Sequence, residues 1–449
     1  MTNKVFFLFR TPIALIILLI IAFGLRTSLL LTSQAACDGD EALVGIMAKH
    51  ILEKGEHPLY AYGQDYSGGA SIEAHLGAIS YALFGMSSVS FKAVGLIISL
   101  SLLLATYFFV RRYYGVDTSF IVALLLAFSP TFVEWNLKVR GGYMLTMIFN
   151  LGLCHLFFKC IEDHEKNKSN QTNKTSAKMF YPLGFGLMAG LAYWNLPVSA
   201  LFIITLLFLW ACHDYGVFLQ KRFLIFCAGV LIGLIPIIAH TTILKIDLWG
   251  FIASKRVTEF DFSPAHILQS FWWFLKHDGP SFFTPHLDHP ASIYYNQIPP
   301  YAWFLFSIAI TAFAYLVINK CINRKSLLYA SPETTVQRVI PFYIFIYIII
   351  YLCESKVKGN PRYLLPLEPF LTLVTALFYV ELLKHSKWIL RGVGLLVLAG
   401  HILIGIGVNA LWLQKPAQFA SAGSVSTVFY QKTILKTIHF LDQQNIQYV

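Results

Sequence analysis

The chain has 449 residues, of which 57% are hydrophobic and only 13% are charged. Soluble domains usually carry about 25% charged residues, so this composition excludes an ordinary soluble protein and indicates an integral membrane protein. The formal net charge of +11 suggests nucleic acid as one possible partner, which the distribution of the charges tests below. Seven scattered cysteines lack the spacing of metal ligands or of a disulfide framework.

Eleven apolar segments follow in chain order, and each is a candidate spanning helix because roughly 20 apolar residues cross a bilayer. Helices satisfy their own backbone hydrogen bonds in lipid. The expected fold class is therefore an all-α bundle of about 11 transmembrane helices, with interfacial helices in the outer loops. Pro197 separates two short segments and predicts a tight helical hairpin. The candidate spans lie at 11–31, 88–110, 118–134, 143–158, 180–194, 197–212, 223–241, 301–318, 340–353, 367–383 and 392–412.

The positions of Lys and Arg predict which loops face the cytoplasm. With the N-terminus inside, the inner segments hold 18 basic and seven acidic residues, whereas the outer segments hold 16 of each. The whole net charge then lies on the inner side, so the charge is a topology signal and nucleic acid is excluded as a partner. The outer side includes a first loop at 32–87, a large loop at 242–300 and a short loop at 354–366. We expect one transmembrane domain over 1–412 and a short extracytoplasmic tail over 413–449.

Three carboxylates lie within the segment Asp38-Gly39-Asp40-Glu41, just outside the first candidate span. The following residues, 42–54, have apolar positions at helical spacing and predict an amphipathic helix along the membrane surface. Asp38 can cap this helix and Glu41 can close a capping box, but capping does not require Asp40. The cluster therefore predicts either a helix start alone, or a helix start combined with a chemical role at Asp40.

The same loop continues with segment 58–74, which is rich in Tyr and Gly and also contains Gln and Asp. Its candidate binding side chains are Tyr62, Gln64 and Tyr66. Aromatic rings stack on the apolar faces of sugars, and the polar groups can bind hydroxyls or a lipid headgroup. The alternative is an interfacial aromatic belt with a turn.

At this point four motifs resemble a known family, in order along most of the membrane body. The first is Asp40–Gly45 with its downstream Gly-x-x-Pro, Tyr-Gly-Gln-x-Tyr and Glu-Ala; the others are Lys138–Tyr143, Gly190–Trp194 and Pro361–Pro369. They resemble the dolichyl-phosphate-mannose–protein mannosyltransferases, glycosyltransferase family 39, which have the GT-C fold and include bacterial undecaprenyl-phosphate-sugar transferases. The sequence departs from some relatives in the large extracytoplasmic domain that these carry at the C-terminal end, which leaves the acceptor open.

The resemblance implies an inverting glycosyltransferase that moves a sugar from a polyprenyl-phosphate donor to a glycan, lipid or protein acceptor on the extracytoplasmic face. Such a reaction needs a general base on the acceptor, and the matching position is Asp40, with Glu41 orienting the acceptor or the base's neighbours. It also needs positive charge or a metal ion at the departing phosphate. Arg362 is the first candidate and Arg140 the second, because arginine binds phosphate oxygens in a bidentate manner.

Three further residues complete the predicted site. Tyr363, beside the first arginine candidate, is a candidate substrate contact, and Glu73 matches the family's Glu-Ala position either as loop scaffold or as a substrate contact. Some relatives hold a divalent metal ion with acids from the first two outer loops, so Glu134 is a candidate metal ligand; its alternative is an interfacial charge at a helix end. A divalent metal ion is the only cofactor expected.

A basic pair and a histidine-containing segment in the large outer loop are not predicted to be part of the site. Lys255 and Arg256 are more typical of a solvated pair than of a phosphate site. The segment His286-Leu287-Asp288-His289 has too few ligands to predict zinc.

Two alternatives to an enzyme are a transporter or flippase of lipid-linked sugars and a non-catalytic scaffold subunit. A transporter would need charges in the middle of spans, and these are nearly absent from the sequence. No Gly-rich nucleotide-phosphate motif is present, in agreement with a lipid-phosphate donor. The predicted location is a bacterial plasma membrane, with the N-terminus cytoplasmic and the site on the extracytoplasmic face.

Overall fold

The computed structural model describes residues 11–33, 37–64, 66–169, 177–245, 247, 259–285, 298–318, 332–355 and 358–414. Within these ranges every regular element is a helix, and the only extended pairings are two isolated bridges. The predicted all-α class is thus confirmed. The tail from residue 415, the pair Lys255 and Arg256, and the segment 286–289 lie outside the described residues.

The bounds of the helices follow the predicted segments closely, and each of the eleven coincides with one helix or one bent pair. In chain order the helices are α2 (Pro12–Thr32), α3 (Gly39–Lys54), α4 (Gly69–Phe84), α5 (Ser88–Tyr114), α6 (Val116–Phe128), α7 (Pro130–Asn136), α8 (Tyr143–Ser169), α9 (Ala177–Asn195), α10 (Ser199–His213), η1 (Val217–Leu219), α11 (Lys221–Gly233), α12 (Ile235–Leu244), α14 (Pro264–Trp273), η2 (Phe274–Asp278), α15 (Gly279–Ser281), α16 (Pro300–Leu316), α17 (Pro332–Cys353), η5 (Pro361–Leu367), α18 (Glu368–Lys384) and α19 (Trp388–Gln414).

The number of full-length spans is smaller than the eleven segments. Five described helices are long and apolar enough to cross a membrane, or seven if each of two bent pairs counts as one span. α10, α16 and the described part of α17 are apolar but shorter. The difference arises because proline residues interrupt two segments and because several others are too short for a 30 Å hydrocarbon core by themselves. The chain is an integral multi-pass membrane protein.

The bend between α6 and α7 turns the chain by 67° at Ser129-Pro130 and replaces the single span expected at 118–134. Backbone groups freed by such a break inside a membrane must find other partners. Arg26 of α2, fully buried, donates to the carbonyls of Leu126 and Ala127. Asn409 of α19 donates to the carbonyl of Phe128. α7 therefore lies across the bundle, and every one of its residues is buried.

α9 and α11 pack together through two glycines on each helix, Gly186 and Gly190 against Gly229 and Gly233. A Cβ atom at Gly186 would lie 2.0 Å from the carbonyl oxygen of Phe226, so any side chain there would push the helices apart. Small residues spaced by four are the usual means of close helix contact in membranes. This contact fixes the end of α9, which is joined to α10 by the predicted tight hairpin at Pro197.

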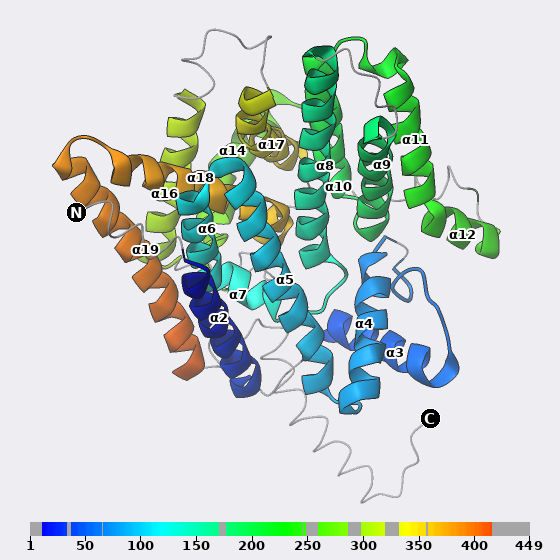
Figure 1. Ribbon diagram of the computed structural model, residues 1–449. Helices are drawn as coiled ribbons and strands as arrows, with labels where there is room; N and C mark the ends of the chain where they lie inside the picture. The colour runs from blue at the N-terminus through cyan, green and yellow to red at the C-terminus, as the bar shows by residue number, and fades with distance from the viewer. Residues whose placement is uncertain are drawn as a thin grey trace, which may run out of the picture.

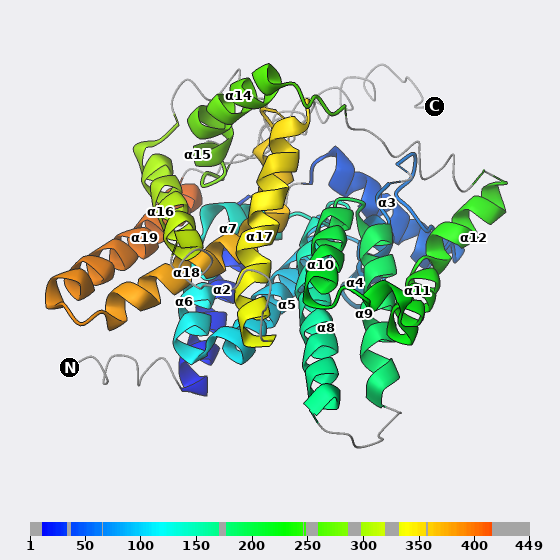
Figure 2. The ribbon, with the colours of Figure 1, turned by 90° about the horizontal axis from the view of Figure 1, so that it is seen from above.

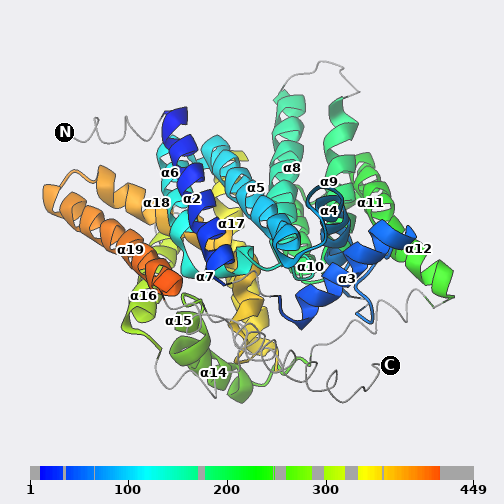
Figure 3. The same ribbon diagram turned by 90° about the horizontal axis from the view of Figure 1, so that it is seen from below.

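The elements that matter for the site gather at one end of the long helices. Figure 1 shows α8 and α9 running side by side, with α3 and α4 below their lower ends. Seen from above, α14 and α15 cover the ends of α16 and α17 (Figure 2). Figure 3 shows that α3, α7 and α14 all lie at this same end. The loops that connect these elements can therefore meet, although they are far apart in sequence.

Candidate active site

The acidic segment begins α3 as a capping box. The Asp38 side chain accepts from the backbone N–H of Glu41, and Glu41 Oε2 accepts from the backbone N–H of Asp38. Glu41 Oε1 accepts from two further donors, the ammonium group of Lys92 and the backbone N–H of Val139 at 2.8 Å. With a 2% exposed side chain, Glu41 is fully engaged in holding α3, α5 and the 137–142 loop together. This arrangement favours a positioning role for Glu41.

Glu73 holds the other half of that loop. Its two carboxyl oxygens accept from the backbone N–H groups of Gly141 and Gly142, at 2.8 and 2.9 Å. Both glycines have positive φ, 74° and 85°, which side-chain-bearing residues rarely adopt. Successive N–H groups in such a turn form a concave anion site, which here is filled by the protein's own carboxyl group. Glu73 therefore supports the loop from behind, without lining the cavity described below.

Asp40 is the acid of this segment that remains open. Its side chain is 44% exposed, and its Oδ2 accepts from Arg140 Nε at 2.8 Å. Arg140 also donates to Asp38 Oδ2 at 3.2 Å and lies over the ring of Trp135. The guanidinium group thereby orients Asp40 while both point into the same space.

A cavity of about 250 Å³ brings most of the predicted residues together. It lies between the start of α3, the first-loop turn at 61–67, the loop 140–143, the α9–α10 hairpin and η5. Six predicted site residues line it: Asp40, Gln64, Tyr66, Arg140, Arg362 and Tyr363. One carboxylate and two guanidinium groups thus face a partly apolar cavity, an arrangement that can remove a proton at one point and hold an anion at another.

Tyr66 lies among these charges. Burial raises the pKa of its phenol, Asp40 and Tyr363 add to this shift, and the two arginines oppose it. The phenol is therefore a neutral hydrogen-bonding group at ordinary pH, suited to a sugar hydroxyl. Burial also raises the pKa of Glu73 to about 8, against the effect of its two N–H donors; its helix, α4, is not among the candidate spans.

Two predicted residues lie elsewhere. Tyr62 does not line the cavity; its hydroxyl donates to Glu56 and contacts His50 Nδ1 at 3.1 Å, so it is part of the outer face of the loop. Glu134 is buried in α7 and forms an ion pair with Lys138 at 3.0 Å. The described residues contain no group of three or more His, Cys, Asp or Glu side chains that could hold a metal ion. Glu134 is paired with a cation in this structure, and its role as a metal ligand stays a prediction.

The sequence analysis did not identify several residues that the structure places at the site. Lys92 and Asn195 are buried polar residues: Lys92 pairs with the first-loop acid, and Asn195 donates to the carbonyl of Gly142 at 3.1 Å. Tyr143 and Tyr347 line the cavity. A lone lysine inside an apolar segment is a signal for Lys92, because charges in membrane helices are expensive and usually have a function. No comparable signal separates the two tyrosines from the other 21 in the chain.

Comparison with known proteins gives a family match over part of the chain. Residues 72–242 match the family model described as dolichyl-phosphate-mannose-protein mannosyltransferase, a range that includes Glu73 and Arg140 but neither Asp40 nor Arg362. No protein of curated function matches the chain in sequence.

Two solved structures have a similar fold. One is ArnT from Cupriavidus metallidurans bound to undecaprenyl phosphate, with a TM-score of 0.50 and 10% identity over 93% of this chain and 76% of that one. The other is the archaeal oligosaccharyltransferase AglB from Archaeoglobus fulgidus in complex with an inhibitory peptide and a dolichol-phosphate. Its TM-score is 0.53, with 13% identity over 89% of this chain and 55% of that one, so the present chain spans about half its length.

The structural matches confirm the predicted GT-C fold of a polytopic membrane protein. The family match over residues 72–242 includes two of the four motifs, Lys138–Tyr143 and Gly190–Trp194, and makes this part of the chain similar to the dolichyl-phosphate-mannose–protein mannosyltransferases.

Proposed function

We propose that the chain transfers a sugar from a polyprenyl-phosphate donor to an acceptor hydroxyl or amine in the 250 Å³ cavity, with inversion at the anomeric carbon. The observation that supports this most is the presence of one open carboxylate, Asp40, with two arginines, Arg140 and Arg362, around a single cavity. The family match and the undecaprenyl phosphate and dolichol-phosphate bound to the structural neighbours support the same donor class.

In the proposed reaction the acceptor oxygen or nitrogen attacks the anomeric carbon from the face opposite the phosphate. A bond from the acceptor atom to that carbon forms, and the bond from the carbon to the phosphate oxygen breaks. Asp40 takes the proton of the acceptor, and polyprenyl phosphate leaves with the bonding electrons. General-base catalysis of this kind contributes about 10² to 10⁴ in rate.

The two arginines would bind the phosphate and stabilise the negative charge that develops as it leaves. Arg362 is the second residue of η5, and its guanidinium lies over the ring of Tyr363. Arg140 is held by the two acids of α3 and by the loop that Glu73 supports. Fixed positive charge in a site with little water stabilises a departing anion far more than charge in bulk solvent does.

A second cavity suits the lipid tail of the donor. It has a volume of about 270 Å³, has no polar lining surface, and lies between α14, α16, α17 and η5. Leu364 and Leu367 of η5 line it, whereas Arg362 and Tyr363 of the same short helix line the polar cavity. η5 thus separates an apolar space from the arginines, as a lipid with a phosphate headgroup would require.

The charge distribution supports an extracytoplasmic location for the site. The outer segments include α3, the loop before η5 and the described part of the large loop around α14. We infer that the N-terminus is cytoplasmic and, from the bacterial relatives of the family, that the membrane is a bacterial plasma membrane. The sugar and the acceptor are open.

The test is genetic complementation with mass analysis of cell-surface glycans and lipids. Cells without the gene should lack one sugar modification, and wild-type protein should restore it. Asp40→Asn keeps the contact to Arg140 but cannot take a proton, so it should lower transfer at least about 100-fold while membrane insertion is unchanged. Glu53→Gln is the matched control, an acid-to-amide change on the exposed face of α3 that should leave activity unchanged. A fully active Asp40→Asn protein would exclude Asp40 as the base.

A further inference from the structure

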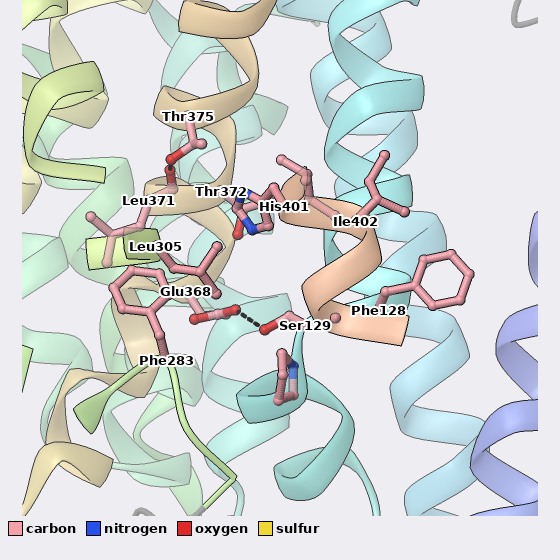
Figure 4. A pocket seen from close by; sticks show the side chains of 13 residues that line it. Phe128, Ser129, Phe283, Leu305, Glu368, Leu371, Thr372, Thr375, His401 and Ile402 are labelled. Atoms are coloured by element: carbon pink, nitrogen blue, oxygen red, sulfur yellow. Dashed lines mark hydrogen bonds between the residues drawn. The ribbon is translucent and has the colours of Figure 1, made fainter. Parts of the chain in front are cut away.

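A buried acid lies deep in the bundle, away from the proposed cavity. Glu368 is the first residue of α18, its side chain is only 5% exposed, and its Oε1 accepts from Ser129 Oγ at 2.8 Å (Figure 4). An ionisable residue at such a position is expensive to bury and calls for a function. Neither the general base nor the phosphate contacts proposed above involve it.

Its partner, Ser129, lies at the 67° bend between α6 and α7. The same hydroxyl accepts from the backbone N–H of Phe132 at 3.3 Å, so Ser129 is also the N-cap of α7. α7 leads directly to Lys138 and Arg140. The direction in which α7 leaves the bend therefore sets where the first phosphate-binding arginine lies.

Glu368 is connected to the second arginine, Arg362, in a similar way. It follows η5 without a break, six residues after Arg362, and is the acid in the first turn of α18. A carboxylate is favoured at a helix N-terminus by the backbone N–H groups there, which fixes Glu368 to α18. One side-chain hydrogen bond thus joins the helix that leads to Arg140 and the helix that follows Arg362, across 239 residues of sequence.

The space beside Glu368 does not suit a substrate. The cavity there is about 30 Å³, lined by Thr372, Thr375 and His401 among apolar side chains, as Figure 4 shows. This volume admits about one or two water molecules, far less than a sugar or a lipid needs. The burial of Glu368 is therefore explained by its hydrogen bond to Ser129, which joins α18 to the start of α7.

We propose that Glu368 and Ser129 are positioning residues that set the spacing of the two phosphate-binding arginines. The inference rests on the proposed function, because it assumes that Arg140 and Arg362 bind the donor phosphate together. Two guanidinium groups bind one phosphate only when their separation matches its oxygen atoms, so a shift of either helix weakens the site even though both arginines remain present.

The test measures binding of undecaprenyl phosphate to the purified full-length chain in lipid nanodiscs, alongside the thermal midpoint of each variant. Glu368→Ala and Ser129→Ala should each weaken binding about tenfold, the expected cost of a lost hydrogen bond to a charged group. The double variant should be no weaker than Ser129→Ala, because that single change already removes the bond between Ser129 and Glu368. Glu368→Gln and Ser129→Thr retain an acceptor and a donor and should bind within about twofold of wild type.

Thr375→Val is the matched control, since its hydroxyl lines the same small cavity but donates only to the carbonyl of Leu371. It should leave binding unchanged. If Glu368→Ala does not fold, Ser129→Ala and the two conservative variants still decide the question. Normal binding by Ser129→Ala, or an effect of Thr375→Val as large, would overturn the positioning role.

Arg362→Ala separates this inference from the function on which it rests. If Arg362→Ala weakens binding but Ser129→Ala and Glu368→Ala do not, only the positioning role is wrong. If Arg362→Ala binds undecaprenyl phosphate as wild type does, the phosphate site and the positioning role are both wrong.

Discussion

Replacement of Glu73 tests whether this residue supports the loop or contacts the substrate. In the wild type its two carboxyl oxygens are the acceptors for the backbone N–H groups of Gly141 and Gly142. Glu73→Ala removes both acceptors at a site that is only 2% exposed. A buried N–H group left without a partner costs about 1 to 3 kcal/mol, so the two together should lower the free energy of unfolding by about 4 kcal/mol.

Two milder variants of the same loop give a graded series. Glu73→Gln retains one acceptor oxygen but turns an NH₂ group toward the other N–H, so about 2 kcal/mol should be lost. Ser67→Ala removes the hydroxyl that donates to the carbonyl of Gly141 at 3.0 Å, and about 1 kcal/mol should be lost. The loss should be largest for Glu73→Ala, because both backbone N–H groups of the glycine turn then lose their acceptor, whereas Ser67 and Asn195 donate only to its carbonyl groups.

The assay combines reversible unfolding of purified protein in SDS with undecaprenyl phosphate binding in nanodiscs. A supporting residue should lower stability and donor binding together, since Arg140 lies immediately before the glycine pair. A substrate contact should lower binding or turnover while the unfolding free energy stays within about 1 kcal/mol of wild type. That second outcome would refute the support role and return Glu73 to the predicted substrate contacts.

Three further predictions concern the bundle. Lys92→Met should lower the free energy of unfolding by about 3 to 5 kcal/mol in the same SDS assay, because it leaves the buried carboxylate of Glu41 without its cation. A loss below about 1 kcal/mol would show that stability does not need the ion pair. Gly190→Leu should abolish folded protein, because a Cβ atom there would lie 2.5 Å from the backbone of α11. Size-exclusion chromatography in detergent measures this loss. Gly24→Leu is the control and should behave as wild type, because a Cβ atom at Gly24 would have no atom within 4 Å. In a cysteine-free background, Phe262→Cys should react with an impermeant thiol reagent in intact cells and Leu219→Cys should not; the reverse pattern would invert the topology.

The positions of the apolar segments were predictable because they depend on local properties. Apolar run length needs no knowledge of distant contacts, and each predicted segment coincides with a helix or a bent pair. The direction inferred from Lys and Arg stays a prediction. The capping box of Asp38 and Glu41 was predictable for the same reason, since its two partners are three residues apart. The pairing of Glu134 with Lys138 could also have been read from its spacing of four on a helix.

The directions of the helix bends were harder to predict from the sequence. Pro130 predicts an interruption, but the direction of α7 depends on Arg26 and Asn409, which come from the two ends of the chain and take up the freed carbonyls. Fewer described helices than the eleven predicted segments are long enough to cross a membrane, because several segments form shorter helices and hydropathy alone does not show whether a break leaves one span.

The sequence by itself determined that this is a many-helix membrane protein with an acidic motif beside its first span, and its four motifs carry a resemblance to a family whose model matches residues 72–242. Only the tertiary structure assigned separate positions to the acids. Glu41 meets Lys92 and Val139, 51 and 98 residues away, Glu73 meets the glycine pair, and Asp40 alone remains open beside Arg140. The physical reason is that a carboxylate's role depends on which donors reach it, and here almost all of those donors come from α5 and from the loop 137–142, which are distant from the acids in the chain.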